Sequence, residues 1–225
     1  MNLGELIQRI RTEANDTVAP YFWSDEALTG WLNDAVAEAC IRGRLLHESQ
    51  NTEVCHVAVA ADNGVYQLHP ALYELTHLRF EPADGSESIA LTLASTEQLD
   101  AFVPEWRALK GSPRQAVQGD TSLRLVPTPD KGGLLKLEGY RLPLTPMVSE
   151  SSDGASPEIH PEHHRHLVNW ALHKGYAVPD METFDPNRSA QAEKEFTAYF
   201  GERPDSNLRR ITREDVPHHV EAFWV

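Results

Sequence analysis

The chain has 225 residues, of which 40% are hydrophobic and 24% are charged, enough apolar material for one domain or two small ones. Its 34 acidic and 20 basic side chains give a formal net charge of -14, which argues against a protein that grips nucleic acid through its phosphates. No run of about 18 apolar residues is present. The N-terminal MNLGELIQRIRTEAND also lacks the apolar core of a signal peptide, so we expect synthesis in a cytoplasm and no membrane partner.

Two amphipathic helices are predicted at the start of the chain. Residues 3–14 carry apolar side chains at helical spacing. The linker PYFWSDE follows. Within it, Ser24 stands where an N-cap is expected, and Asp25 and Glu26 lie in the first turn of the next helix, where the helix dipole favours acidic groups. The second helix is predicted over residues 25–47. Its apolar stripe is wide enough to pack on another helix or on a neighbouring subunit and consists of Leu28, Trp31, Leu32, Ala35, Val36, Ala39, Gly43 and Leu46.

The middle of the chain reads as a small β module. Residues 55–61 alternate between apolar and polar side chains, and Asn63-Gly64 separates them from a second run over 66–68, which is a strong hairpin signal. The segment STEQLDAFVPEW predicts one short helix that starts after Ser95 or Thr96 and is stopped by Pro104. Further alternation predicts strands at Leu78 and Phe80, at Ile89, Leu91 and Leu93, at Leu123 and Leu125, and at Leu135 and Leu137.

Helices return after the polar loop PMVSESSDGASPE, and we expect one over residues 161–178 and another over 187–200, stopped by Gly201. The remaining segment has no regular element and reads as an extended arm. The fold class is therefore α+β, with the N- and C-terminal helices packed together, a central β module and a C-terminal arm. The predicted parts are an N-terminal helical part (1–50), a β-rich module (51–145), a C-terminal helical part (146–201) and the arm (202–225).

Five histidines gather in PEIHPEHHRHLVNWALHKGY, residues 157–176. A zinc site on one helical face needs imidazoles four residues apart, and His160, which would pair with His164, precedes Pro161 and is pushed out of helical geometry. His163 and His166 could share a metal only with a third ligand from elsewhere. A pH-sensing role is the second alternative. Apolar residues on nearly all sides of the helix from Leu167 to Val178 favour a third interpretation, a buried packing helix with imidazoles at its margin.

No residue is predicted to be catalytic, to bind a cofactor or to hold a metal. The sequence contains no G-x-S-x-G elbow, no P-loop and no dinucleotide glycine fingerprint. Cys40 lies in a predicted helix and Cys55 in a predicted strand, so two buried thiols are favoured over a disulfide. We therefore expect a protein that is not an enzyme.

The arm carries a local basic cluster and ends in large apolar residues. Exposed aromatic side chains at a chain end are a liability unless a surface receives them. That surface belongs either to the chain's own helices or to a partner. The residues concerned are Arg209, Arg210, Arg213, Phe223, Trp224 and Val225.

Three segments together resemble the head-to-tail adaptor (connector) proteins of tailed phages. They are LIQRIRTEANDTVAPYFWSDEALTGWLNDAVAEACIRGRLL, the centre from W...KGSPRQAV to LRLVPTPDKGGLLKLEGYRLP, and PEIHPEHHRHLVNWALHKGYAVPDMETFDPNRSAQAEKEFTAYFGER. The resemblance covers nearly the whole chain and rests on the overall order of elements, without a sharp catalytic motif. It does not explain the histidine-rich start of the helix at 161–178.

The resemblance implies a structural protein of the virion neck or tail, assembled in the host cytoplasm. Such adaptors form a homo-oligomeric ring, commonly a dodecamer of twelve copies, that docks on the portal protein and presents a platform to a tail protein of the nozzle, stopper or tail-tube type. DNA passes through the channel without specific binding, as an acidic lining would allow.

The resemblance also implies roles for individual residues. The arm residues Arg209, Arg210, Arg213, Phe223, Trp224 and Val225 are assigned to portal contact. Trp31, Leu167 and Trp170 are assigned to packing in the ring or in the core. Two other functions stay open: a metal-dependent or wall-degrading hydrolase that uses the His160–His173 region, and a soluble regulatory binding module.

Overall fold

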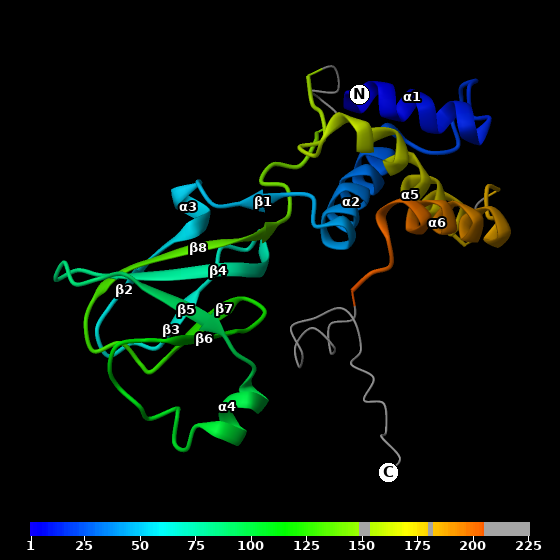
Figure 1. Cartoon of the computed structure of the whole chain (residues 1–225). Coiled ribbons are helices and arrows are strands. Elements are labelled where there is room, and N and C mark those ends of the chain that lie inside the picture. The colour runs from blue at the N-terminus through cyan, green and yellow to red at the C-terminus, as the bar shows by residue number, and fades with distance from the viewer. Residues whose placement is uncertain (149–153, 180–181, 205–225) are drawn as a thin grey trace, which may run out of the picture. The chain divides into compact units, whose positions relative to one another are not determined.

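The computed structural model describes residues 1–148, 154–179 and 182–204 of the chain. It divides into a helical unit, formed by residues 1–46 and 141–203, and a β unit that includes residues 47–140 (Figure 1). Each unit has its own apolar core. The predicted α+β class is confirmed.

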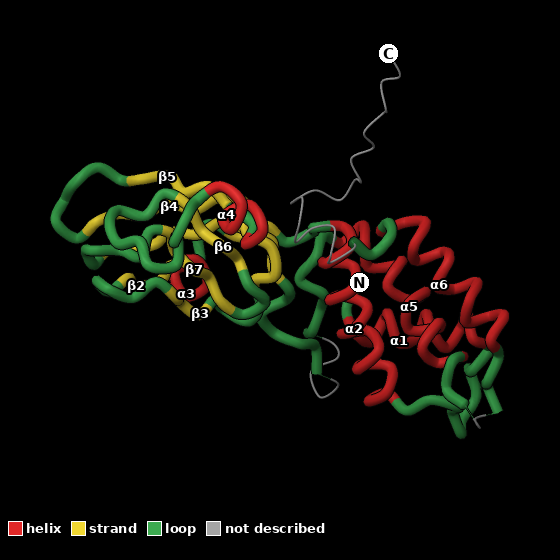
Figure 2. The backbone as a smooth tube through the Cα atoms, turned by 90° about the horizontal axis from the view of Figure 1, so that it is seen from below, coloured by secondary structure: helices red, strands yellow, loops and turns green. Residues whose placement is uncertain are grey.

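The helical unit packs helices from before and after the β unit into one core. Figure 2 shows its helices gathered side by side. The helices are α1 (Leu3–Ala14), α2 (Asp25–Gly43), α5 (His164–Tyr176), which follows the 3-10 turn η2 (Pro161–His163), and α6 (Pro186–Phe200). Their shared core is built from residues of all four, among them Leu6, Ile10, Leu28, Leu32, Leu167, Val168 and Phe196. Among the described residues, no helix has both the length and the apolar character needed to cross a membrane.

Local signals set the ends of these helices. The Ser24 side chain accepts a hydrogen bond from the backbone of Ala27, as expected for an N-cap, and α6 ends at Gly201 as predicted. The second helix, however, is shorter than the predicted range 25–47. It stops at Gly43 because Arg44 adopts the left-handed conformation, with φ of 49°, and His47 belongs to a strand instead.

The β unit is built around an eight-stranded sheet with the order β1-β8-β4-β5-β6-β7-β3, and β2 also pairs with β8. The neighbours β5 and β6 run parallel, whereas β2 and β8, β4 and β5, β6 and β7, and β3 and β7 run antiparallel. The strands are β1 (His47–Glu48), β2 (His56–Val59), β3 (Val65–Gln67), β4 (Leu72–Pro82), β5 (Ile89–Leu93), β6 (Gln115–Gln118), β7 (Ser122–Val126) and β8 (Gly133–Arg141). Two short helices, α3 (Thr52–Cys55) and α4 (Thr96–Phe102), interrupt them, and α4 is the short helix predicted before Pro104.

The predicted hairpin at Asn63-Gly64 is wrong. The strands on its two sides have different partners, because β2 pairs with β8 and β3 pairs with β7. The connection itself bonds to distant backbone: Asp62, with φ of 61°, donates to the carbonyl of Pro129, and the Gly64 carbonyl accepts from Leu125. These bonds, one to β7 and one to the connection between β7 and β8, replace the two-residue turn that the local sequence favours.

Two glycines in the helical unit have opposite surroundings. Gly175 in α5 lies against Trp23, and a Cβ atom there would come within 2.7 Å of the indole Cζ2. Gly30 in α2 is exposed, and a Cβ atom there would meet nothing within 4 Å. Helix α5 therefore needs glycine at position 175 for packing, whereas α2 does not need glycine at position 30.

We expect Gly175→Ala to lower the free energy of unfolding by about 1–3 kcal/mol, because the added methyl group overpacks the core. Gly30→Ala is the matched control and should raise that free energy by about 0.5–1 kcal/mol, since alanine favours an exposed helix position. Urea unfolding followed by circular dichroism at 222 nm measures both. Equal effects of the two substitutions would contradict the close approach of Gly175 to Trp23.

Candidate functional site

Three exposed apolar side chains of the helical unit gather in the connection between α1 and α2, residues 15–24, called here the α1–α2 loop. Val18 is 78% exposed, Tyr21 46% and Phe22 43%. Single exposed apolar residues are ordinary on protein surfaces, but a cluster of this kind marks an interaction site or an aggregation liability. The loop is therefore a candidate contact surface.

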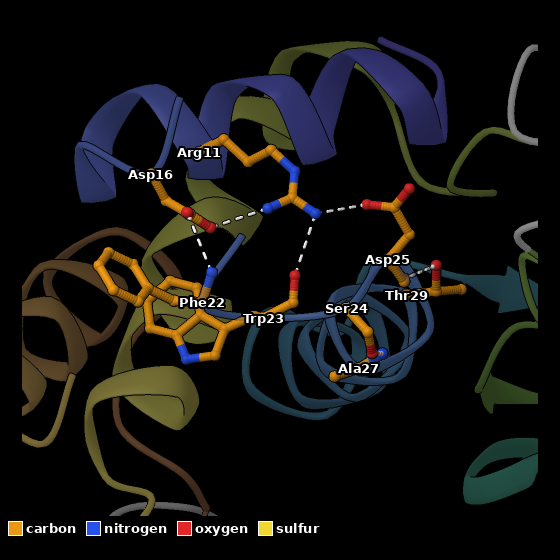
Figure 3. A network of polar contacts seen from close by, with 8 residues as sticks. All are labelled: Arg11, Asp16, Phe22, Trp23, Ser24, Asp25, Ala27 and Thr29. Atoms are coloured by element: carbon orange, nitrogen blue, oxygen red, sulfur yellow. Dashed lines mark hydrogen bonds and ion pairs between the residues drawn. The ribbon is translucent and has the colours of Figure 1, made fainter. Parts of the chain in front are cut away.

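A buried ionic network holds this loop from beneath (Figure 3). The guanidinium of Arg11, on α1, donates to Asp16 at 2.8 Å, to Asp25 at 2.6 Å and to the carbonyl of Trp23 at 3.0 Å. The second carboxylate oxygen of Asp16 accepts the backbone N–H of Phe22 at 3.0 Å. Arg11 and Asp16 are almost completely buried, whereas Asp25 stays largely exposed.

The same network orients the aromatic residues of the loop. Arg11 lies 3.7 Å from the centre of the Tyr21 ring, a cation–π contact that leaves the outer face of the loop open. Trp23 turns inward and makes edge-on contacts with Trp31 and Tyr176. Because the loop's backbone is already ordered, binding to a partner would cost the loop little additional conformational entropy.

A second apolar surface lies at the other end of α1. It is a recess of about 200 Å³ between α2 and two segments that follow β8, with Leu144 and Val148 exposed nearby. Asn33 closes one side by exchanging two hydrogen bonds of 2.9 Å with the backbone of Met147. The lining residues are Asn33, Val36, Ala37, Leu142, Pro143, Thr145, Pro146, Met147, Ser156, Pro157 and Glu158.

The recess and the loop are separated by the length of α1. The backbone N–H of Leu3, at the start of this helix, donates to the carbonyl of Ala155, which comes just before the recess residues 156–158. The loop begins at the opposite end, after twelve residues of helix, or about 18 Å at 1.5 Å per residue. Figure 1 shows the connection after α1 leaving the end of this helix that lies away from the label N. The unit thus carries two different apolar surfaces.

The residues assigned from the sequence to ring or core packing lie in the helical unit. Leu167 is fully buried in its core, and Trp31 and Trp170 are half-buried against it. Trp170 lies 4.9 Å from Phe196, measured between ring centres, and Arg42 lies above its ring. A part of each indole remains accessible, so a role in contacts between copies stays a prediction.

The histidines do not form a ligand set in the structure. His164 is buried and lies within hydrogen-bond distance of the carbonyls of Ile159 and Met1, both at 2.9 Å. His163 and His166 face α6, where they contact Tyr199. Within the residues that the structure describes, no group of three histidine, cysteine or acidic side chains is placed to hold a metal ion.

Neither cysteine is suited to nucleophilic chemistry. Both are buried thiols outside any disulfide, as the sequence predicted, although Cys55 ends α3 and does not lie in a strand. Asn51 caps α3 by accepting the N–H of Glu53, and β2 begins at His56, one residue after the predicted start of the alternation. Burial and the nearby carboxylate of Glu158 raise the pKa of Cys40 to about 12, so its reactive thiolate is not populated at neutral pH.

The arm residues assigned to portal contact lie outside the described part of the chain. The last described segment, residues 201–204, lies beside α2, because Arg203 forms an ion pair of 3.2 Å with Glu38. Arg42 fixes the preceding turn through Thr197 at 2.8 Å. The arm therefore continues from a defined point on the helical unit.

Comparison with protein families gives a match over nearly the whole chain. The family model described as SU10 adaptor protein matches residues 1–220, which include both units and most of the arm. A search of curated proteins found no match for the chain.

The Arg11 network leads to a test of stability. We expect Arg11→Met to lower the free energy of unfolding by about 3–5 kcal/mol, because it leaves the buried carboxylate of Asp16 without its cation. Arg9→Met is the matched control: Arg9 forms an exposed pair with Glu13 on the same helix, and its loss should cost no more than about 0.5 kcal/mol. Urea unfolding of the two full-length variants makes the comparison, and similar losses would show that the buried network does not hold the loop.

Proposed function

The chain belongs to the SU10 adaptor protein family, and from this premise we propose that it is a subunit of the head-to-tail adaptor ring of a tailed phage. The family membership identifies a structural component of the phage particle, and we propose that the chain has no catalytic role. In this proposal the ring contains twelve copies, docks on the portal protein and receives a tail protein of the nozzle, stopper or tail-tube type. It lies in the neck of the virion and is assembled in the host cytoplasm.

The observation that supports ring formation is the presence of two different apolar surfaces on one unit. A ring with cyclic symmetry is built from heterologous contacts, in which each subunit offers one surface to one neighbour and another surface to the next. We assign the α1–α2 loop of one copy to the recess between α2 and residues 142–158 of the adjacent copy. Trp31 and Trp170, half-buried on the helical core, are assigned to the edge of the same contact, whereas Leu167 stabilises the core beneath it.

The charge of the chain supports a channel role. With a formal net charge of -14, a ring of copies repels the phosphate backbone and lets DNA slide through without specific binding. A dedicated DNA-binding protein would instead present clustered lysine and arginine side chains.

The arm completes the proposal. We assign portal contact to its basic cluster and to its apolar end, that is to Arg209, Arg210, Arg213, Phe223, Trp224 and Val225. The parts 1–50 and 146–201 then supply the ring body, 51–145 the β-rich module and 202–225 the connection to the portal. The hydrolase alternative is not carried further, because His163 and His166 face aromatic side chains of α6 and no third ligand joins them among the described residues.

The ring contact is tested on the loop. We expect the double substitution Val18→Asp and Phe22→Asp to prevent ring formation, because two carboxylates would have to be desolvated in an apolar contact. Phe102→Asp is the matched control. Phe102 is 81% exposed but lies on α4 in the β unit, so this variant should assemble into rings as the wild type does. Negative-stain electron microscopy and light scattering, with and without purified portal, measure assembly. Rings formed equally well by the loop variant would disprove the assigned contact.

The arm is tested by truncation after Pro204, which keeps the Arg203–Glu38 ion pair and therefore the end of the helical unit. We expect the shortened chain to keep its helical circular dichroism signal and to lose binding to purified portal in a pull-down. A full-length variant with Phe223→Ala and Trp224→Ala separates the apolar end from the basic cluster. Full attachment of the truncated chain would refute the role of the arm and leave the loop contact untouched.

A further inference from the structure

The imidazoles that the sequence left unexplained form a cluster between the start of α5 and the last turn of α6. The ring of His166 is stacked on that of Tyr199, with ring centres 3.4 Å apart and planes inclined by 14°. His163 also contacts Tyr199, with its Nδ1 3.2 Å from the hydroxyl. Both rings also approach Phe200, the last residue of α6. The end of α6 is thus attached to α5 through histidine side chains.

The geometry identifies the protonation state of His166. Its Nε2 accepts a hydrogen bond of 3.0 Å from Nε of Arg165, and a guanidinium group can only donate. Nε2 must therefore carry a lone pair, so the stacked imidazole is neutral. The contact of His163 places no such condition on its ring, because a phenol hydroxyl can both donate and accept.

Charged groups from three elements act on His166. Within its own segment, Arg165 and His163 oppose protonation and Glu162 favours it, and Arg9 of α1 also opposes it. From α6 the ring of Tyr199 contributes a cation–π attraction that favours the charged form. Burial is the largest influence, and together these effects lower the pKa of His166 below its ordinary value. Burial and the neighbouring imidazoles of His160 and His164 lower the pKa of His163 in the same way, against the opposing charge of Glu162.

We propose that His166, with His163, forms a pH-sensitive latch that holds the last turn of α6 to α5 when neutral and releases it when protonated. Protonation removes the acceptor of Arg165 and places two cations side by side. Burial and this repulsion outweigh the cation–π attraction of Tyr199, so protonation weakens the stacked position of the imidazole. The last turn of α6 is the point from which the chain continues into the arm. The latch is a property of the helical unit and does not depend on the proposed adaptor role.

A second clamp limits what the latch can release. Arg42 of α2 donates to the Thr197 hydroxyl and to the carbonyl of Gly201, and a guanidinium stays charged throughout the physiological range. These two contacts bracket the last turn of α6, so this turn stays tethered to α2 while protonation loosens its contact with α5. Because the folded-state pKa is lowered, the latch is fully closed above the unfolded-state value of about 6.5 and is lost as the pH falls through the folded-state pKa.

Hydrogen exchange of the full-length chain tests the latch at its site of action. We expect the protection factors of the amides at 197–200, corrected for intrinsic exchange, to fall about threefold to tenfold between pH 7.5 and pH 5.5. This fold-change corresponds to the loss of one aromatic pair. His166→Phe keeps a ring for stacking but cannot be protonated, so the protection in this variant should depend less on pH than in the wild type, with only the contribution of His163 left. His77→Gln, at an exposed histidine of β4, is the control and should behave as the wild type.

An NMR titration of the imidazole resonances provides an independent readout. The His166 midpoint should lie below about 6.5 in the wild type and should rise in Arg165→Gln, which removes an exposed cation and needs no core substitution. A wild-type midpoint at or above the ordinary value, or an equal loss of protection in His166→Phe and wild type, would overturn the proposal. If His166→Phe does not fold, the Arg165→Gln titration decides alone.

Discussion

The buried guanidinium of Arg11 is the constraint on which the helical unit depends. A cation removed from water is tolerated only when its donors are matched by charged or polar acceptors, and here Asp16, Asp25 and the Trp23 carbonyl surround it. All three acceptors come from the connection between α1 and α2 or from the first turn of α2. The charge therefore determines the path of that connection. A hydrophobic side chain of the same size would avoid the desolvation cost but would leave the loop without a partner.

Trp23 joins this polar network to the apolar core. Its carbonyl belongs to the network, whereas its indole packs edge-on against Trp31 and Tyr176. The indole fits only because Gly175 of α5 has no side chain at the point of closest approach. Four helices of one core are thus tied to a short stretch of loop: α1 through the arginine, α2 through its N-cap and first turn, and α5 through the glycine, with α6 packed on α5.

Local signals explain what the sequence could predict. The helices at 3–14 and 187–200 and the cap at Ser24 depend on periodicity and on residues a few positions away, and the structure contains them. The hairpin at Asn63-Gly64 failed because its strands take partners from β7 and β8, which are remote in sequence. For the candidate site, the sequence revealed the aromatic linker but not the exposure of its side chains. One signal was available: Arg11 stands next to the apolar stripe of its helix, where an arginine is buried only with acidic partners. The stacking of imidazoles on α6 had no local signal at all.

The exposure of the loop's apolar side chains follows from the same constraint. The space beneath the loop is occupied by the guanidinium and two carboxylates, so Val18 and Phe22 cannot turn inward without breaking a charged network. The isolated subunit therefore keeps apolar surface in water, and that cost is recovered only when another surface covers it. A chain that is ordered by its own contacts and keeps a shaped apolar surface exposed suits the structural adaptor role that we propose for it.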